Sequence, residues 1–432
     1  MKKHWLTLTI LLLLATLLLG CAPGQTGQTE NLSTNDLMAN IQPTEPKETL
    51  LEKAPLDVIL TSTSVQSHIN DFSVKLFQSS LDKQQNTLVS PLSVLLALAM
   101  TANGAEEETL AQMEATFGCS LDYLNFYLQA YAENLPQTEK AKLSIANSIW
   151  LKTDEDIVVR QDFLQTNADY YNAGVYQTPF DAQTLKQINK WVKTHTDGMI
   201  DKILDEIPRD TVMYLINALA YDAEWEEPYT DIQIGENVFT TENAEEQKVD
   251  FMYGSEYQYL QDEKAQGFIK YYNGRQYAFV ALLPNEGVSV ADYVAGLNGE
   301  KLLNLLSQPQ QVEVRTAIPK FTGEYTLEMS QLLQKMGMVD AFNPDLANFR
   351  GMADFPPDHN LYIDKVLHKT YIAVDERGTK AGAVTAVAMN KATSAAPQMF
   401  KTVYLNRPFV YMLIDSQNQL PLFIGTVMSV KD

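Results

Sequence analysis

Cysteine is nearly absent from this sequence: among 432 residues there are only Cys21 and Cys119. Two cysteines allow one bridge at most, so the fold is not a disulfide framework and packing of the core must hold it. The sequence also lacks HExxH and any cysteine–histidine cluster with metal-ligand spacing. It therefore predicts neither a metal site nor a bound cofactor.

Positive charge is also scarce. The chain has 32 lysines and arginines against 54 aspartates and glutamates, which gives a formal net charge of −22. A protein this acidic repels nucleic acid and anionic lipid, so the composition excludes nucleic-acid binding. Membrane attachment would then have to come from an anchor rather than from surface charge.

The longest largely apolar run lies at the N-terminus, where Leu6 to Leu19 follows Lys2 and Lys3 and precedes Gly20-Cys21. This run is shorter than the ~20 residues that a membrane-spanning helix needs. It is typical of a secretory signal, which we predict over residues 1–20. A cysteine directly after the small residue resembles the bacterial lipobox. The resemblance implies a lipid on Cys21 and an exported protein anchored at the bacterial cell surface or envelope. A plain signal peptide and a short membrane anchor remain alternatives.

Residues 21–62 are rich in Gln, Thr, Asn, Glu and Pro, and few of them are large and apolar. Such a segment cannot bury enough surface to fold, so we predict a flexible tether. From residue 63 to residue 432 no Pro/Gly/Ser-rich linker and no repeat interrupts the chain. This part is predicted to be one large α+β domain.

Several elements can be predicted from apolar periodicity. Ile69 to Leu81 has helical spacing, and Leu92 to Met100 is apolar on nearly every side, which predicts a buried helix with Ser90 as its N-cap. Leu143–Leu151 and the apolar run Val212–Tyr221 are predicted strands. Leucines and methionines between Leu327 and Met336 predict a helix that ends at Gly337.

The most unusual stretch lies between two β-prone blocks, 371–374 and 409–414. Small uncharged residues recur there at every second position: Thr379, Ala381, Ala383 and Thr385. In an extended chain these four side chains share one face. The pattern predicts a spare strand, held outside the fold and able to slide into a sheet. An ordinary Ala/Gly/Thr-rich surface loop is the alternative.

Residues 374–383 read VDERGTKAGA. This order resembles V-x-E-x-G-T-E-A-A-A, the reactive-loop hinge of the serpins, which are protease inhibitors that work by loop insertion. Lys380 and Gly382 depart from the pattern. Further serpin-like motifs follow in register from about Ile69 to Met428: NTLVSPLS at 86–93, AN at 146–147, INKWV at 188–192, NA at 217–218, RPF at 407–409 and PLFIG at 421–425.

The resemblance implies a single α+β serpin domain with a large, mainly antiparallel central sheet, further sheets, about eight to nine helices and an exposed reactive-centre loop. It implies an inhibitor rather than an enzyme, monomeric, with a serine protease as its partner; a cysteine protease is the alternative partner. The cleaved loop would insert as a new strand of the main sheet. About fourteen residues at ~3.3 Å each would move a bound protease by ~45 Å.

The resemblance also assigns residues. It places the hinge at Glu376, Gly378, Thr379, Ala381, Ala383 and Thr385. Spacing from Glu376 puts the cleaved bond between Ala392 and Thr393, with Lys391 as runner-up, whereas counting back from Arg407 points near Pro397. Ala392 suits elastase-like proteases and Lys391 suits trypsin-like ones. A polar cluster that lets the sheet open is implied at Ser90, Ser93, Asn217 and His368.

Three other functions compete with inhibition. A non-inhibitory serpin, acting as a protease substrate or a binding scaffold, would carry bulky or charged residues on the inserting face. A solute-binding lipoprotein would show two lobes of βα repeats. A serine hydrolase could use Ser90 or Ser93 with His368, but the sequence lacks the G-x-S-x-G nucleophile elbow.

Overall fold

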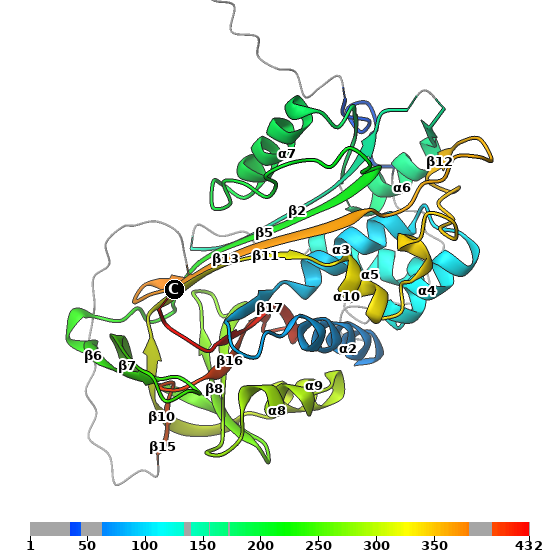
Figure 1. The fold of residues 1–432 in the computed structure, drawn as a ribbon. Helices are drawn as coiled ribbons and strands as arrows, with labels where there is room; N and C mark the ends of the chain where they lie inside the picture. Colours follow the sequence, from blue (N-terminus) through cyan, green and yellow to red (C-terminus); the bar gives the residue numbers. More distant parts are fainter. Residues whose placement is uncertain are drawn as a thin grey trace, which may run out of the picture.

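The computed structural model describes residues 35–44, 63–133, 140–154, 156–171, 173–379 and 400–431. In these residues a six-stranded main sheet lies between helix α7 on one face and helices that include α2 and α3 on the other (Figure 1). A larger second sheet packs below one end of the main sheet. The α-helices are α2 (Thr63–Ser80), α3 (Pro91–Ala102), α4 (Glu107–Phe117), α5 (Leu121–Glu133), α6 (Gln161–Tyr171), α7 (Ala182–His195), α8 (Val290–Ala295), α9 (Gly299–Ser307) and α10 (Ser330–Lys335).

The main sheet has the strand order β11-β13-β14-β5-β2-β4. Four of its six pairings are antiparallel, so the prediction of a mainly antiparallel sheet is confirmed. Strands β13 and β5 run parallel where they pair directly, and β2 and β4 are also parallel. Its strands are β2 (Ala141–Lys152), β4 (Gly174–Thr178), β5 (Met213–Glu224), β11 (Phe321–Glu328), β13 (Lys365–Val374) and β14 (Gly378–Thr379).

The second sheet has nine strands in the order β1-β17-β16-β9-β8-β7-β10-β15, with β6 paired to β7. These are β1 (Thr87–Val89), β6 (Ile234–Thr240), β7 (Glu246–Gln261), β8 (Ala265–Tyr271), β9 (Tyr277–Pro284), β10 (Gln310–Pro319), β15 (Lys401–Tyr404), β16 (Phe409–Asp415) and β17 (Leu420–Val427). A small third sheet joins β3 (Val158–Val159) to β12 (Ala353–Asp354).

Most of the elements predicted from periodicity are present. The apolar helix is α3, and all twelve of its residues are buried, as expected for a helix without a polar face. The predicted strands correspond to β2 and β5, and β5 is buried along nearly its whole length. The prediction of a single α+β domain with a large central sheet is confirmed by this architecture.

One local prediction is confirmed in position and one is wrong. Ser90 occupies the N-cap position of α3 and its carbonyl accepts from the Val94 amide, although its side chain makes no capping hydrogen bond. Leu327 belongs to strand β11, opposite His368 of β13, and the helix α10 begins only at Ser330. Residues 321–328 alternate in burial with a period of two, and this tertiary environment determines their conformation.

Part of the predicted tether packs against the domain. The Leu37 amide donates to the Val175 carbonyl at 2.9 Å, and the Gln177 amide donates to the Asn35 carbonyl at 3.0 Å, so residues 35–37 extend the edge of the main sheet beside β4. Leu37, Met38 and Ile41 pack on the hydrophobic core. The flexible-tether prediction therefore needs correction over residues 35–44, because these three apolar side chains give the segment a surface to bury.

Cys119 is a free, half-buried cysteine. Burial, followed by the nearby charge of Glu114, raises the pKa of its thiol to about 11, so little thiolate exists near neutral pH. In the described part of the chain, none of the helices combines the length and the apolar character needed to cross a membrane. The predicted signal segment, residues 1–20, and Cys21 lie outside the described residues.

Candidate functional site

The hinge predicted from the sequence begins as a strand of the main sheet. Strand β14 lies between β5 and β13: Gly378 pairs with Glu224 and Thr379 with Ala223, while Thr379 also pairs with Val374. Further along, β5 and β13 pair directly, from Tyr214 to Leu219 and from Lys365 to Thr370. The sheet is therefore already parted at one end, and the first two residues of the loop fill the gap.

Gly378 is required there by close packing. A Cβ at this position would lie 1.9 Å from the Ala223 carbonyl oxygen and 2.8 Å from the Glu224 Cα, so a side chain would push β14 away from β5. Thr379 is 2% exposed, and its hydroxyl lies 2.5 Å from that of the buried Tyr272. The first small residue of the alternating face thus points into the protein.

A tight turn connects β13 to β14. The Asp375 carboxylate accepts from the amides of Arg377 and Gly378 at 2.8 and 3.2 Å, and the Asp375 amide donates to the Gly378 carbonyl at 3.0 Å. The Trp225 indole donates to the Asp375 carbonyl at 2.8 Å, and the Trp225 amide donates to the Arg377 carbonyl at 2.7 Å. The buried Trp225 therefore holds the turn from the side of β5.

Glu376, the acidic residue of the hinge, pairs with Lys320 at 3.0 Å. Partial burial favours its neutral form, but hydrogen bonds from its own backbone amide and from Lys320 outweigh this effect and leave the pKa of Glu376 below its ordinary value. The carboxylate is therefore charged at neutral pH, and the ion pair attaches the turn to the start of β11.

The far end of the loop is fixed in the second sheet. Strand β15 pairs in parallel with β10, from Val314↔Lys401 to Ala317↔Tyr404. The Arg315 guanidinium lies 3.5 Å from the centre of the Phe400 ring, which adds a cation–π contact at the last residue before β15. Residues 380–399 thus connect two different sheets. Ala381, Ala383, Thr385, Lys391, Ala392 and Thr393 fall in this interval, outside the described residues.

A polar chain crosses the middle of the main sheet, below the hinge. The Ser90 amide donates to His368 Nε2 at 3.0 Å, His368 Nδ1 lies 2.6 Å from Asn217 Oδ1, and Asn217 Nδ2 donates to Asn147 Oδ1 at 2.8 Å. His368 and Asn217 are opposite each other where β13 and β5 pair. Ser90, Asn217 and His368 are all fully buried.

The structure thus brings together three of the four residues expected in this cluster, and their role in opening the sheet remains a proposal. Ser93 is buried on α3, and its hydroxyl has no hydrogen-bond partner among the described residues. Asn147 completes the chain on β2; its motif was recognised in the sequence, but it was not predicted to belong to this cluster. An Asn within an apolar strand, as at Asn217, is the signal that could have identified it.

The protonation state of His368 follows from its neighbours. A backbone amide can only donate, so Nε2 carries no proton and Nδ1–H donates to Asn217 Oδ1. Complete burial lowers the pKa of His368 to about 3, which is consistent with a neutral ring. Neither ring nitrogen is free to act on a serine hydroxyl, and the ring is sealed from solvent. This geometry disfavours the hydrolase alternative.

Comparison with known proteins identifies the family. The family model described as "Serpin (serine protease inhibitor)" matches residues 67–430. The chain is 47% identical to tengpin, a thermophilic serpin, in its native-state crystal structure, with a TM-score of 0.83 over 91% of this chain and 99% of that one. The latent-state structure of tengpin gives a TM-score of 0.75 at 46% identity, over 90% of this chain and 100% of that one.

A serpin-like protein of Thermococcus kodakarensis is 26% identical over 429 residues, which cover 97% of this chain and 99% of that protein. The family match covers the whole globular part of the sequence, and the order of the motifs agrees with it. The TM-score is higher with the native-state structure of tengpin than with its latent-state structure. This chain belongs to the serpin family of serine protease inhibitors.

Proposed function

We propose that this chain is a suicide-substrate inhibitor of serine proteases, which traps its target by inserting the cleaved reactive loop into the main sheet. The observation that supports this proposal most directly is the position of β14 between β5 and β13. Strand β14 is antiparallel to both neighbours, which are parallel to each other. A longer strand in the same direction can therefore pair on both sides along the whole seam.

The inserted strand also supplies the driving force. The closed seam contains one ladder of hydrogen bonds between β5 and β13, whereas a sheet with an inserted strand contains two. Thr379 is already buried, and the alternating small residues that follow in the sequence would continue its buried face. The native form then persists because insertion is slow, and the inserted form is the more stable one.

The chemistry requires a covalent intermediate with the protease. The protease serine Oγ attacks the Ala392 carbonyl carbon, the C–N bond to Thr393 breaks, and the Thr393 nitrogen leaves as an amine after it takes a proton. Ala392 is then held as an ester on the protease. Insertion of the loop residues that precede Ala392 moves the attached protease across the sheet. Distortion of its active site misaligns the groups that activate water, and the ester is not hydrolysed.

Small residues around the assigned bond favour an elastase-like target, and Lys391 gives trypsin-like proteases a second bond to cleave. The alternative function is that of a non-inhibitory serpin, cleaved as a substrate. Gly382 is the feature that favours this alternative, because glycine weakens a strand.

Incubation with elastase and with trypsin tests the proposal. We expect an SDS-resistant band at the summed mass of the two proteins and a large rise in the melting temperature of the cleaved chain. The released fragment should begin at Thr393 with elastase and at Ala392 with trypsin. Cleavage without the band and without a rise in melting temperature would show that the chain is a substrate and not an inhibitor.

A matched pair of variants separates insertion from cleavage. Thr385→Arg places a bulky charge on the face expected to be buried, so this variant should be cut without forming the SDS-resistant band. Val384→Arg places the same charge on the opposite face, and it should still form the band. Equal behaviour of the two variants would contradict insertion in this register.

A further inference from the structure

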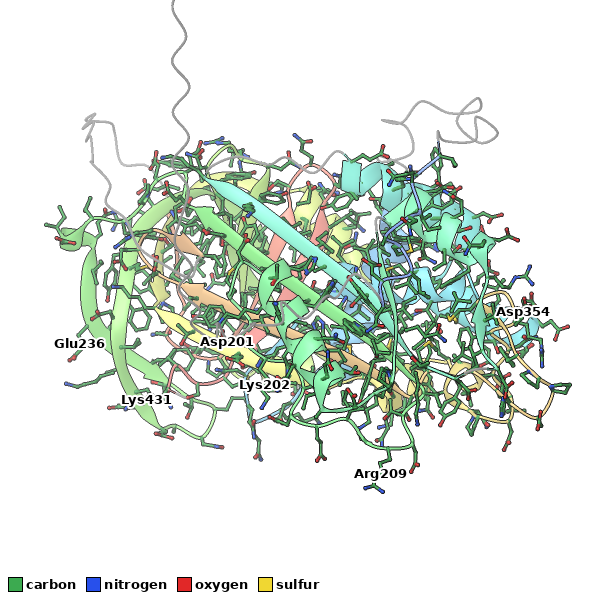
Figure 2. All side chains as sticks on the ribbon, turned by 90° about the horizontal axis from the view of Figure 1, so that it is seen from above. Asp201, Lys202, Arg209, Glu236, Asp354 and Lys431 are labelled. Atoms are coloured by element: carbon green, nitrogen blue, oxygen red, sulfur yellow. The ribbon has the colours of Figure 1, made fainter. Side chains whose placement is uncertain are left out.

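Two loops that are far apart in the sequence meet at one end of the small third sheet. Strand β3 pairs with β12 in antiparallel order, with Val158 opposite Asp354, and Figure 2 labels Asp354 near one end of the molecule. Asp154 and Asp156 precede β3, and residues 356–359 follow β12. Because the two strands are antiparallel, the chain before β3 and the chain after β12 leave the ladder at the same end.

Three side chains that can ligate a metal ion converge there. Asp154, Asp156 and His359 each offer one ligand atom, and these atoms lie within 4.8 Å of one another. His359 Nδ1 lies 3.9 Å from Asp156 Oδ2, which is too far for a hydrogen bond. This ring nitrogen is shielded from solvent and has no hydrogen-bond partner among the described residues, although the side chain as a whole is 38% exposed. Buried polar atoms usually have a partner, so the nitrogen favours a ligand that lies between the three side chains.

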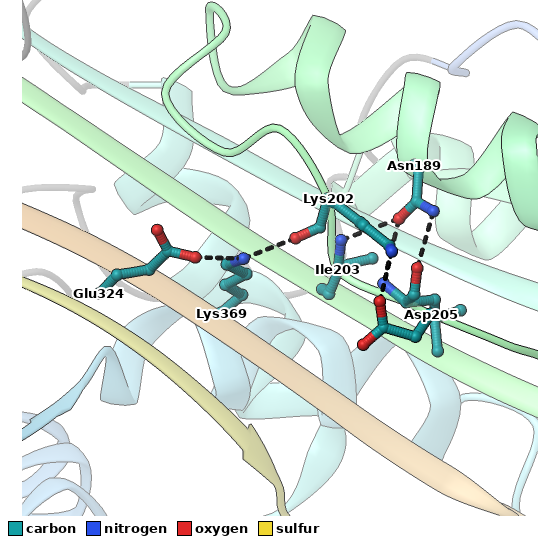
Figure 3. A network of polar contacts seen from close by, with 7 residues as sticks. Asn189, Lys202, Ile203, Asp205, Glu324 and Lys369 are labelled. Carbon is teal, nitrogen blue, oxygen red and sulfur yellow. Dashed lines mark hydrogen bonds and ion pairs between the residues drawn. The ribbon is translucent and has the colours of Figure 1, made fainter.

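The charges at this place also favour a cation. Carboxylates elsewhere on the surface are balanced by lysines, as where Lys369 pairs with Glu324 (Figure 3). In the described part of the chain, neither Asp154 nor Asp156 forms an ion pair with a lysine or an arginine. Two carboxylates held close together repel each other, and a divalent cation between them would neutralise both.

We propose that Asp154, Asp156 and His359 bind a divalent transition-metal ion, for which Zn²⁺ is the best match. An imidazole nitrogen with carboxylate oxygens is a donor set of zinc sites, whereas Ca²⁺ and Mg²⁺ prefer oxygen alone. Two atoms bound to one Zn²⁺ at about 2.1 Å lie roughly 3.4 Å apart in a tetrahedral site. The 3.9 Å between His359 Nδ1 and Asp156 Oδ2 therefore requires only a small rotation of either side chain. A water molecule would complete the tetrahedron from the solvent side.

The backbone holds the ligands close to their binding positions. The Asp156 amide donates to Asp154 Oδ1 at 3.0 Å, and the His359 amide donates to the Pro356 carbonyl at 3.1 Å. With the β3–β12 ladder beside them, the three side chains need little further ordering to bind an ion. The sequence predicted no metal site because the histidine and the aspartates lie far apart along the chain, and only the fold brings them together.

Titration with Zn²⁺ tests the proposal on the full chain, purified without a histidine tag and stripped of metal with a chelator. We expect isothermal titration calorimetry to show one Zn²⁺ bound per chain, and we expect the melting temperature to rise with the Zn²⁺ concentration. Ca²⁺ and Mg²⁺ should have neither effect. A wild type that binds no Zn²⁺ would overturn the site.

A matched pair of carboxylate variants locates the ion. Loss of an outer partner of a metal site weakens binding by about 10- to 100-fold, so Asp156→Asn, which removes a direct ligand, should weaken Zn²⁺ binding by at least as much. Asp354→Asn removes a neighbouring carboxylate, which pairs with Arg160, and should bind Zn²⁺ as tightly as the wild type. Equal affinities of Asp156→Asn and the wild type would overturn the assignment.

The visible spectrum of bound Co²⁺ provides a readout of the ligands themselves. We expect the Co²⁺-loaded wild type to show the intense absorption of a four-coordinate ion, and we expect His359→Gln to lose it. A weak, six-coordinate spectrum that is the same in both proteins would indicate an adventitious ion only, and it would overturn the proposal.

Discussion

At the scale of single residues, His368 links the underside of the sheet to the seam. Its neutral ring accepts from the Ser90 amide and donates to Asn217, so one side chain joins α3, β13 and β5. A protonated ring would present N–H groups on both nitrogens, and the Ser90 amide would then face a donor instead of an acceptor. The link therefore exists only in the neutral form.

The depressed pKa of His368 predicts a pH dependence of stability. Between pH 6.5 and about pH 3 the unfolded chain binds a proton at this histidine and the native chain does not. Its contribution is complete above pH 6.5 and falls by up to about 1.4 kcal/mol per pH unit as the pH is lowered through this window. We expect His368→Gln to lose less free energy of unfolding than the wild type between pH 7 and pH 5, as measured in urea. Parallel pH profiles would contradict this assignment.

At the scale of elements, the short strand β14 determines where insertion starts. Gly378→Ala introduces a Cβ 1.9 Å from the Ala223 carbonyl oxygen, a clash with backbone that a rotamer change cannot relieve. We expect strain of roughly 1–3 kcal/mol, which displaces β14 and slows insertion. More inhibitor molecules should then be cleaved as substrate for each protease complex that forms. The readouts are the stoichiometry of inhibition and the gain in melting temperature on cleavage.

Thr379→Ser is the control for this substitution, because it keeps the hydroxyl that contacts Tyr272. This variant should inhibit like the wild type. If Gly378→Ala kept both the stoichiometry of inhibition and the gain in melting temperature on cleavage, β14 would not be needed in its present position.

Much of the fold could be predicted from the sequence, and the exceptions have physical causes. Helix α3 and strand β5 are buried on every side, so their apolar runs identify them directly. The conformation of Leu327 could not be predicted, because pairing with His368 across the sheet decides it. Helical spacing of leucines was the weaker signal there.

The residues of the candidate site could likewise be predicted from the sequence only in part. The hinge and the residues of the polar cluster were predicted through their motifs, and the structure places Ser90, Asn217 and His368 in contact. Asn147 lies in a motif that was recognised, but its place in the cluster could not be predicted, because the pairing of β2 with β5 brings it to Asn217. The pre-inserted state of β14 was also not predictable, since it depends on how far β5 and β13 separate at one end.

At the scale of the whole molecule, the reactive loop connects the main sheet to the second sheet. Its start lies in the main sheet at Thr379, and its end lies in the second sheet at Lys401. An uncut loop of this kind cannot travel along the seam while β15 stays paired to β10. Cleavage of the Ala392–Thr393 bond removes this restraint, and the proposed inhibitor therefore responds to proteolysis.

We also propose that the mature chain is lipid-anchored through Cys21, as its position after Gly20 suggests. Asn35 already lies against the domain, so the anchor would keep the domain within roughly 50 Å of the membrane. We expect wild-type protein expressed in bacteria to incorporate labelled fatty acid and to sediment with membranes. Cys21→Ala should do neither and should still inhibit. A wild type without label would contradict the lipid anchor.

The two residues of β14 have a consequence for kinetics. Forming the first pairs of a new strand is the slow event in sheet growth. The chain must lose conformational entropy before the hydrogen bonds of the ladder can offset that loss. Here Gly378 and Thr379 are paired before a protease arrives. Insertion after cleavage is then elongation from an existing nucleus, and it can outpace hydrolysis of the ester.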